Sequence, residues 1–351
     1  MMNTRILVLI TGVLFFSSCR KEEPEAPAAD SAGLGAYVSN EGSFMNSNAS
    51  ITYITPGGSS LQDPFLDRNG FPIGDVLQSL AFSGEKGFAV VNNSQRIIAF
   101  NRFTFAFEGE VDGLSYPRYM LPLDNGKAYV SNGSMDGELV ILNLSDLSVA
   151  GSIPVGKGPE RMAKSDDLVA VTNSGGWLSD QTVTLIHAPT DQVTATITVG
   201  DRPIDLVVDA SGDFWVLCSG KALYDDSWNI IGHTDASLWR LSGADGHVEW
   251  TTQLGVNGDH PDDLAISPDG EMIYINLAGI HALSTIQPES GHTVIIPGNF
   301  HSLDVHPANG EIWLTSVPDF VSSSEVLRYR PSGALITTYQ SGIGSNGVWW
   351  P

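Results

Sequence analysis

The dominant pattern along the chain is a short apolar strand, often aromatic, that ends in asparagine or another small polar residue. Corresponding residues of successive copies lie roughly 39 to 58 positions apart, and most intervals lie near 40. A repeat of this length is typical of the blades of a β-propeller. The seven copies are Ala36–Asn40, Phe88–Asn92, Ala128–Asn132, Val169–Asn173, Phe214–Cys218, Met272–Asn276 and Glu311–Thr315.

Further apolar segments surround most copies and complete a unit of four strands. One precedes the copy across a turn, as in Leu206–Asp209, one follows it, as in Leu139–Asn143, and a fourth ends the unit, as in Thr194–Gly200. Turn sequences such as Pro268-Asp269-Gly270 are typical of links between antiparallel strands. Seven such units predict an all-β fold, a seven-bladed β-propeller. A β-sandwich or a β-helix is the alternative, but neither has a four-strand unit at this period.

The two ends of the repeat region indicate how the ring closes. The first copy, around Tyr37, has no strand before it, and the last segment, Ser345–Trp350, has none after it. We therefore expect Gly347–Trp350 to form the innermost strand of the first blade, so that residues 34–351 make one closed domain.

The first 33 residues have the pattern of a targeting signal followed by a flexible tether. Arg5 precedes an apolar run, Ile6–Phe16, which is too short to span a bilayer but has the size of a signal-peptide core. Ser17 and Ser18 stand directly before Cys19 and resemble a bacterial lipobox. This predicts a lipoprotein signal over residues 1–18, a lipidated Cys19, and a flexible Pro/Ala-rich tether over 19–33 that anchors the protein without spanning the membrane. An ordinary secretory signal with a chance cysteine is the alternative.

Composition narrows the partners. The 351 residues include 17 Lys+Arg and 40 Asp+Glu, a formal net charge of -23. This balance disfavours nucleic acid and anionic lipid, both of which need clustered basic residues. The two cysteines exclude a disulfide scaffold and a four-cysteine zinc site.

Several motifs carry a resemblance to a known family. The Tyr-Val-Ser-Asn copies resemble the repeats of YncE-like propellers, and particularly those of the YncE-like surface lipoproteins of Bacteroidota. The other motifs that carry it are Asn40–Phe44, Leu77–Ser79, Val91–Ser94, Tyr116–Tyr119, Gly158–Met162 and Trp215–Gly220. Arg20–Glu23, directly after Cys19, is similar to the export signal that sends such lipoproteins to the outer face of the outer membrane.

That resemblance implies a function. Members of the BtuG type capture cobalamin at the cell surface and pass it to a TonB-dependent transporter, and similar propellers capture ferric siderophores. It implies an outer-membrane, lipid-anchored protein facing the outside, with a corrinoid or siderophore ligand and a TonB-dependent outer-membrane transporter as partner. The histidines are scattered without metal-ligand spacing, so we expect no cofactor and no resident metal. The net acidity disfavours an anionic cargo and so favours cobalamin slightly.

The candidate binding residues lie on loops that a propeller brings to one face. Loops leading into the innermost strands carry polar side chains at matched places, and longer loops between second and third strands carry aromatic ones. Aromatic rings beside polar groups suit a large planar or macrocyclic ligand. The alternative is a structural role at the channel opening. The candidates are Glu41, Phe44, Gln78, Arg118, Tyr119, Glu160, Arg161, Trp177, Asp205, Trp228, Asp262, His301 and Phe320.

Catalysis has little support in the sequence. No nucleophile elbow, phosphate loop or His-Glu-X-X-His motif occurs, and Cys218, at a strand end, is typical of a small buried residue. His260 and His301 are expected on adjacent loops, where one could coordinate a metal carried by the ligand. We expect a binding protein; the alternatives are an adhesion or scaffold propeller for protein or glycan, and a propeller enzyme such as a lactonase.

Overall fold

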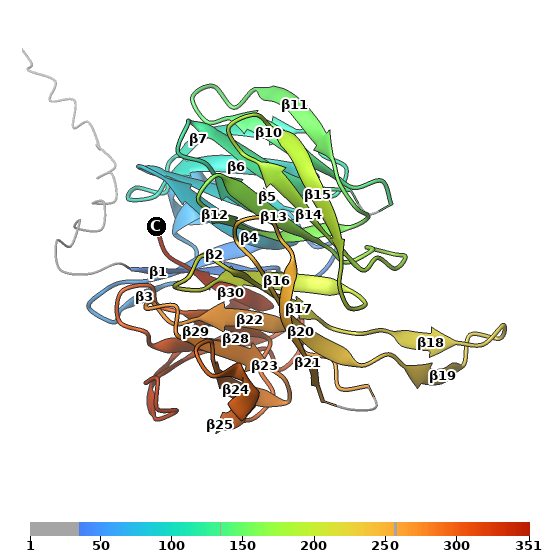
Figure 1. Ribbon diagram of the computed structural model, residues 1–351. Coiled ribbons are helices and arrows are strands. Elements are labelled where there is room, and N and C mark those ends of the chain that lie inside the picture. Colours follow the sequence, from blue (N-terminus) through green and yellow to red (C-terminus); the bar gives the residue numbers. More distant parts are fainter. Residues whose placement is uncertain (1–34, 134, 256–257) are drawn as a thin grey trace, which may run out of the picture.

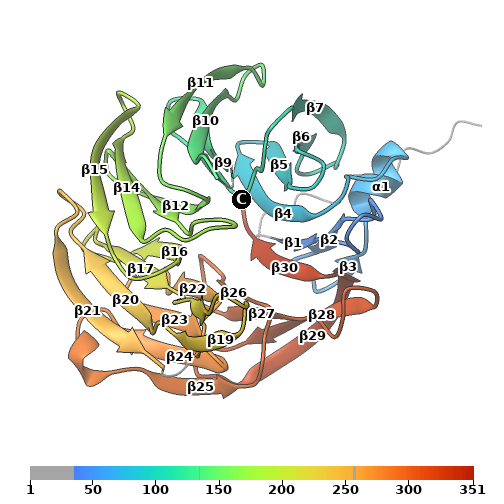
Figure 2. The same ribbon diagram turned by 90° about the vertical axis from the view of Figure 1, so that its right-hand side faces the viewer.

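The computed structural model describes residues 35–133, 135–255 and 258–351. Seven four-stranded antiparallel sheets stand around a central channel (Figures 1 and 2), which confirms the seven-bladed β-propeller. The expected signal peptide, Cys19 and tether lie outside the described residues. Within the described ranges, no helix is long and apolar enough to cross a membrane.

Each blade runs from an innermost strand at the channel to an outermost strand at the rim. Blade 1 is the exception in chain order, because its innermost strand comes from the C-terminus. From inside outward, blade 1 consists of β30 (Ser345–Trp349), β1 (Ala36–Asn40), β2 (Ser50–Ile54) and β3 (Ser60–Leu61), and blade 2 of β4 (Leu77–Ser83), β5 (Lys86–Val91), β6 (Arg96–Asn101) and β7 (Phe107–Asp112). Blade 3 consists of β8 (Met120–Pro122), β9 (Lys127–Asn132), β10 (Glu138–Asn143) and β11 (Val149–Pro154). Blade 4 consists of β12 (Pro159–Ser165), β13 (Leu168–Asn173), β14 (Thr182–His187) and β15 (Gln192–Thr198).

The remaining blades follow the same order, and blade 5 carries an inserted hairpin between its second and third strands. Blade 5 consists of β16 (Pro203–Val208), β17 (Phe214–Cys218), β20 (Ala236–Leu241) and β21 (Val248–Leu254). Blade 6 consists of β22 (Asp263–Ile266), β23 (Met272–Asn276), β24 (Gly279–Ser284) and β25 (Thr293–Pro297). Blade 7 consists of β26 (Ser302–Val305), β27 (Ile312–Ser316), β28 (Ser323–Tyr329) and β29 (Leu335–Ile343). The insertion is β18 (Ala222–Tyr224) with β19 (Ile230–His233), and it projects from one face of the ring (Figure 1).

The closure predicted from the chain ends is confirmed. Strand β30 pairs antiparallel with β1, with Val348 opposite Val38 and Trp349 opposite Tyr37. The last strand therefore completes the first blade and joins the two ends of the described chain in one sheet. A short helix that the sequence pattern did not indicate, α1 (Pro64–Asn69), follows β3 and is capped by the Asp63 carboxylate at the Leu66 amide.

Burial explains the repeated apolar segment. The second strand of each blade is covered on both faces by its neighbouring blades; every residue of β1, for example, is buried. A strand enclosed on both faces reads as a continuous apolar run rather than as an alternating one. The outermost strand β7, in contrast, buries only Val111.

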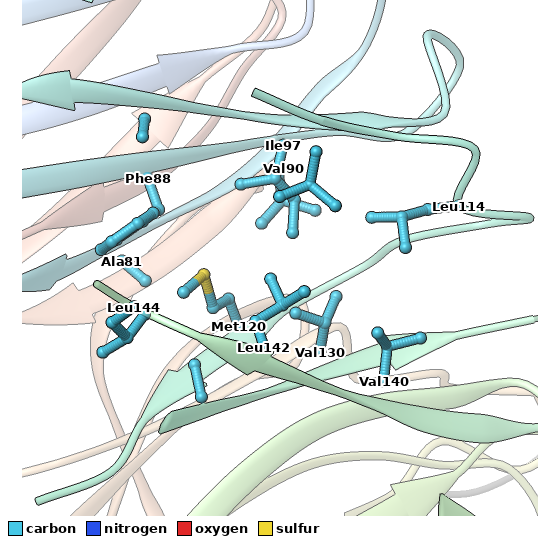
Figure 3. Close-up of a cluster of buried hydrophobic side chains, with 13 residues drawn as sticks. Ala81, Phe88, Val90, Ile97, Leu114, Met120, Val130, Val140, Leu142 and Leu144 are labelled. Atoms are coloured by element: carbon cyan, nitrogen blue, oxygen red, sulfur yellow. The ribbon is translucent and has the colours of Figure 1, made fainter. Parts of the chain in front are cut away.

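The hydrophobic core is divided into clusters, most of them lying between adjacent blades. In one of them, Phe88 and Val90 of β5 and Ile97 of β6 pack against Met120 and Val130 of blade 3 (Figure 3). Cys218 belongs to another cluster, where burial raises the pKa of its thiol to about 12. The cysteine is therefore a buried core residue, as its place at a strand end indicates.

Candidate functional site

One end of the channel is bordered by two sets of loops, and we call this end the mouth. The inner loops lead into the innermost strands, and the rim loops join second to third strands. Backbone hydrogen bonds hold the two sets together, from the Ser174 amide to the Gly158 carbonyl and from the Ser219 amide to the Arg202 carbonyl, each 2.9 Å long. The same face carries the β18–β19 hairpin (Figure 1).

Bulges at the start of the innermost strands explain the positions of several polar residues of the mouth. The register skips Gln78 in β4 and Asn346 in β30, and it places Glu160 and Arg161 of β12 within one irregular step. A bulge leaves a residue without a cross-strand partner and changes the direction of its side chain. These residues are thereby free of the regular ladder at the place where the channel opens.

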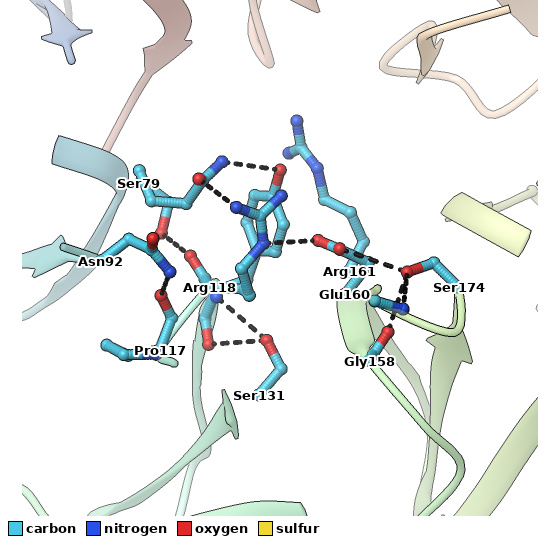
Figure 4. Close-up of polar contacts among 12 residues, drawn as sticks. Ser79, Asn92, Pro117, Arg118, Ser131, Gly158, Glu160, Arg161 and Ser174 are labelled. Atoms are coloured by element: carbon cyan, nitrogen blue, oxygen red, sulfur yellow. Dashed lines mark hydrogen bonds and ion pairs between the residues drawn. The ribbon is translucent and has the colours of Figure 1, made fainter. Parts of the chain in front are cut away.

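Arg118 is the centre of a hydrogen-bond network across blades 2 to 4 (Figure 4). Its guanidinium donates to the Gln78 side-chain carbonyl and, at 2.9 Å, to Glu160. Glu160 also accepts a bond of 3.3 Å from Ser174, and Gln78 donates to the Tyr119 hydroxyl. Burial alone would lower the pKa of Arg118, but the Glu160 carboxylate raises it above its usual range.

Glu41 extends the network to blade 1. Its carboxylate accepts a hydrogen bond of 3.0 Å from the Asn346 amide, which also donates to the backbone carbonyls of Leu77 and Gln78. Burial raises the pKa of Glu41, although His301, Asn346 and Arg118 oppose this rise. Burial thus makes the neutral form of this side chain more favourable than it is in a free glutamate.

Arg161 lies deeper and forms the floor beneath this network. Its guanidinium is 3.2 Å from Asp263 and 3.7 Å from Asp205, and it lies 4.5 Å from the centre of the Tyr119 ring and 5.3 Å from that of Trp349. Asp304 adds a third carboxylate to its surroundings. The positive charge of Arg161 is therefore shared by three carboxylates.

Those three acids also join consecutive blades. The carboxylates of Asp205, Asp263 and Asp304 accept hydrogen bonds from the backbone amides of Leu264, Leu303 and Val348, at 3.0, 2.9 and 2.7 Å. Burial raises the pKa of each, to about 6 for Asp304, and Arg161 opposes the rise. Asp205 thus links blades 5 and 6 besides lining the channel.

Aromatic side chains stand around the mouth on the rim loops. Trp177 is 75% exposed, and its ring lies 6.3 Å from that of Tyr116, which in turn faces Arg118. Phe320, on the opposite side, contacts the His301 ring at 5.6 Å. Phe44 is exposed and follows Ser43, whose hydroxyl bonds the Phe320 carbonyl.

The remaining candidates are placed differently. Asp262 is exposed as a residue, but its carboxyl is partly desolvated, which raises its pKa against the opposing effect of the nearby His301 and His260. Trp228 is 81% exposed at the turn of the β18–β19 hairpin, where its ring contacts that of Tyr224. The contacts therefore bring Glu41, Gln78, Arg118, Tyr119, Glu160 and Arg161 together and leave Trp228 apart from them.

Asp304, Asn346 and Tyr116 contribute to the mouth or its floor without being among the predicted binding residues. Asp304 has no counterpart at a matched place in the repeats, because Leu206, Leu264 and Leu303 are equivalent and Ser302, not Asp304, stands where Asp205 and Asp263 do. Tyr116 has no repeated counterpart either, so matched positions could not reveal these two residues.

The channel has a second hollow at the opposite end. A cavity of about 470 Å³ is lined there by residues of blades 5 to 7, among them Asp209, Asp269, Asp304 and Pro307. In the part of the chain that the structure describes, no group of three or more His, Cys, Asp or Glu side chains is arranged to hold a metal ion.

Comparison with solved structures gives the same fold. A quinoprotein alcohol dehydrogenase-like protein from Bacteroides thetaiotaomicron has a TM-score of 0.65 at 13% identity, over 90% of this chain and 78% of that one. A Bacteroides fragilis protein proposed to be a 6-phosphogluconolactonase gives 0.64 at 11% identity, over 93% and 99%. Hydrazine synthase from Kuenenia stuttgartiensis gives 0.59 at 13%, over 84% and 90%. No family profile and no curated protein matches the sequence.

Proposed function

We propose that the protein is a surface lipoprotein whose mouth binds a metal-bearing nutrient, a corrinoid or a ferric siderophore, and passes it to a TonB-dependent outer-membrane transporter. The observation that carries this proposal is the hydrogen-bonded polar mouth around Arg118, with Trp177 and Phe320 exposed at its edge. Large ligands are held by apolar contact area and oriented by a few polar groups, which this arrangement offers.

Local charge favours the corrinoid over an anionic siderophore. Arg118 and Arg161 are both paired with carboxylates, so neither offers an unpaired positive charge to a ligand. The acids of the mouth and its floor outnumber them: Glu41, Glu160, Asp205, Asp262, Asp263 and Asp304. A neutral or cationic ligand avoids the repulsion that an anionic ferric catecholate would meet.

The anchor belongs to the same proposal. A lipidated Cys19 would hold the protein on the outer membrane, and the tether could extend by at most about 3.5 Å per residue. The chain enters the propeller through β1, which runs toward the mouth and so begins at the opposite face. The mouth would then be free to meet a ligand from the medium.

Titration with cyanocobalamin and with a ferric catecholate, followed by tryptophan fluorescence, tests the binding step. We expect saturable binding of cyanocobalamin at or below micromolar concentration and weaker binding of the catecholate. Absence of binding of either ligand at tens of micromolar would refute the proposal.

A second candidate function, attachment to another protein, is favoured by the β18–β19 hairpin. Leu223, Tyr224, Trp228, Ile230 and Ile231 are all exposed on this two-stranded element. Contiguous exposed apolar side chains of this kind are typical of interaction sites. Under this alternative the protein binds neither cargo, and deletion of the hairpin abolishes attachment to the partner.

A further inference from the structure

Two histidine rings meet where the hairpin joins the propeller. His233 is the last residue of β19, and His260 lies on the inner loop of blade 6. Nδ1 of His233 is 3.0 Å from Nε2 of His260, and the ring centres are 5.1 Å apart with a tilt of 52°. The pair thus bridges two loops that are separated along the chain.

The other nitrogen of His260 fixes how this ring can act. Its Nδ1 lies 2.6 Å from the Ser219 carbonyl oxygen, which can only accept a hydrogen bond. Nδ1 therefore carries a proton, and in the neutral ring Nε2 presents its lone pair toward His233. In a metal-bound histidine, one ring N–H usually donates to a backbone carbonyl or carboxylate, and the lone pair of the other ring nitrogen binds the metal.

The spacing also suits a shared ion. Two imidazole nitrogens bound to one tetrahedral ion at about 2.0–2.1 Å lie about 3.3 Å apart, slightly more than the 3.0 Å found here. The backbone at Gly258 runs close to the His233 ring, where a Cβ would lie 3.0 Å away, so this ring is packed in place. The acidic side chain of Asp262 lies near His260 and adds negative charge.

We propose that His233 and His260 form a two-imidazole site for a late first-row divalent cation such as Cu²⁺, Ni²⁺ or Zn²⁺. Imidazole is a preferred ligand of all three ions, and Cu²⁺ binds such sites most tightly. No third protein ligand joins the pair within the described ranges, so water completes the coordination. The bound ion would cross-link the hairpin to the inner loop of blade 6.

A second histidine pair is a useful comparison. Nδ1 of His281 and Nδ1 of His292 are 2.7 Å apart in blade 6, and Nε2 of His281 lies 2.9 Å from the Leu277 carbonyl. This separation is about 0.6 Å less than two nitrogens on one tetrahedral ion require. We therefore assign this pair as a hydrogen bond between the two rings; burial and the neighbouring His281 lower the pKa of His292.

Cu²⁺ titration of the untagged full chain, stripped of metal beforehand, tests the site without any organic ligand. We expect one ion bound at micromolar concentration, with two-nitrogen coordination in its electron paramagnetic resonance spectrum. His260→Gln and His233→Gln should each weaken binding at least tenfold, and the control His292→Gln should leave it unchanged.

A second readout reports on the cross-link itself. Chymotrypsin should cut at the exposed Tyr224 and Trp228, and Cu²⁺ should slow this cleavage several-fold in the unmodified protein but not in His260→Gln. His233 lies on the projecting hairpin, so its replacement should leave the thermal unfolding of the propeller unchanged. Binding that persists in both variants, or no binding at 100 μM Cu²⁺, on the order of the weakest useful affinity, would overturn the assignment.

Discussion

At the scale of single residues, Asp304 combines two roles that oppose each other. Its carboxylate accepts the 2.7 Å hydrogen bond from the Val348 amide that links blade 7 to the closing strand. The same carboxyl is buried beside Asp205 and Asp263 and shares Arg161 with them, so its charged form is costly. The effect of burial exceeds the opposing effects of Arg161 and of the Val348 hydrogen bond, and the pKa of Asp304 rises to about 6.

This gives the contribution of Asp304 a definite sign with pH. A folded-state pKa of about 6, above the unfolded value near 3.9, means that the folded protein binds more protons between these values. The contribution of this group to the free energy of unfolding therefore falls as the pH rises from 4 to 7. Replacing Asp304 by Asn removes the titration and keeps an oxygen acceptor for Val348.

Unfolding in urea at two pH values can measure this contribution by comparing the original protein with Asp304→Asn. The free energy of unfolding of the original protein minus that of Asp304→Asn should be about 2 kcal/mol more favourable at pH 4.5 than at pH 7.5. An equal difference at both pH values would show that the carboxyl is not perturbed in this way.

Single aromatic residues at the mouth allow a separate test of the proposed ligand site. Trp177→Ala and Phe320→Ala should each weaken binding of cyanocobalamin about two- to tenfold, because each removes apolar contact area at the rim. Trp228→Ala is the control, since this tryptophan is also exposed but its ring lies against that of the hairpin residue Tyr224. Fluorescence titration measures all three, and equal losses would place the ligand on the hairpin as well.

At the scale of elements, the closing strand β30 has consequences for the whole ring. Val348 is buried, and Trp349 lies opposite Tyr37 in β1 and donates its indole N–H to Ser39. Without β30, blade 1 loses its innermost strand, and Asp304 loses its partner in the next blade.

Deletion of residues 348–351 should therefore lower the free energy of unfolding by at least about 3 kcal/mol, on the order of the loss of one buried tryptophan. Thermal unfolding followed by circular dichroism measures this change. Replacement of residues 222–233 by a short Gly/Ser turn is the control, because the hairpin forms its own two-stranded sheet with exposed side chains. A truncation as stable as this control would contradict the closure argument.

The elements also show what the sequence could and could not predict. The second strands were predictable because they are buried on both faces, and three of them, β1, β17 and β23, have the bounds that the pattern indicates. Hairpin β18–β19 was expected only as a long loop, because its apolar residues have no core to face. The His233–His260 contact joins residues from two separate loops, and no local pattern encodes such a pairing.

The candidate site was also predictable from the sequence only in part. Matched positions in the repeats indicated Gln78, Glu160 and Arg161, because bulges recur at the start of the innermost strands. Which charges neutralise each other could not be predicted in that way. The pairing of Arg118 with Glu160, and of Arg161 with acids of blades 5 and 6, depends on the closed ring.

At the scale of the whole molecule, the net charge of -23 and the acidic mouth act in the same direction on a charged ligand. An anionic ferric catecholate would be repelled both at a distance and in contact, whereas neutral cyanocobalamin would experience neither effect. Salt screens such repulsion, with a Debye length of about 10 Å at 0.1 M and about 3 Å at 1 M. The two proposed ligand classes should therefore differ in how their affinities depend on salt.

We expect the affinity for cyanocobalamin to change less than twofold, on the order of experimental error, between 20 mM and 500 mM NaCl, because no net ligand charge is screened. Any binding of the ferric catecholate should instead strengthen several-fold over this range. The double variant Glu41→Gln, Asp262→Asn removes two acids at the mouth and should reduce that salt dependence without altering the response to cyanocobalamin. Catecholate binding that weakens as salt is added would mean that a positive group at the mouth is free to receive an anion, and would reverse the order of the two ligands.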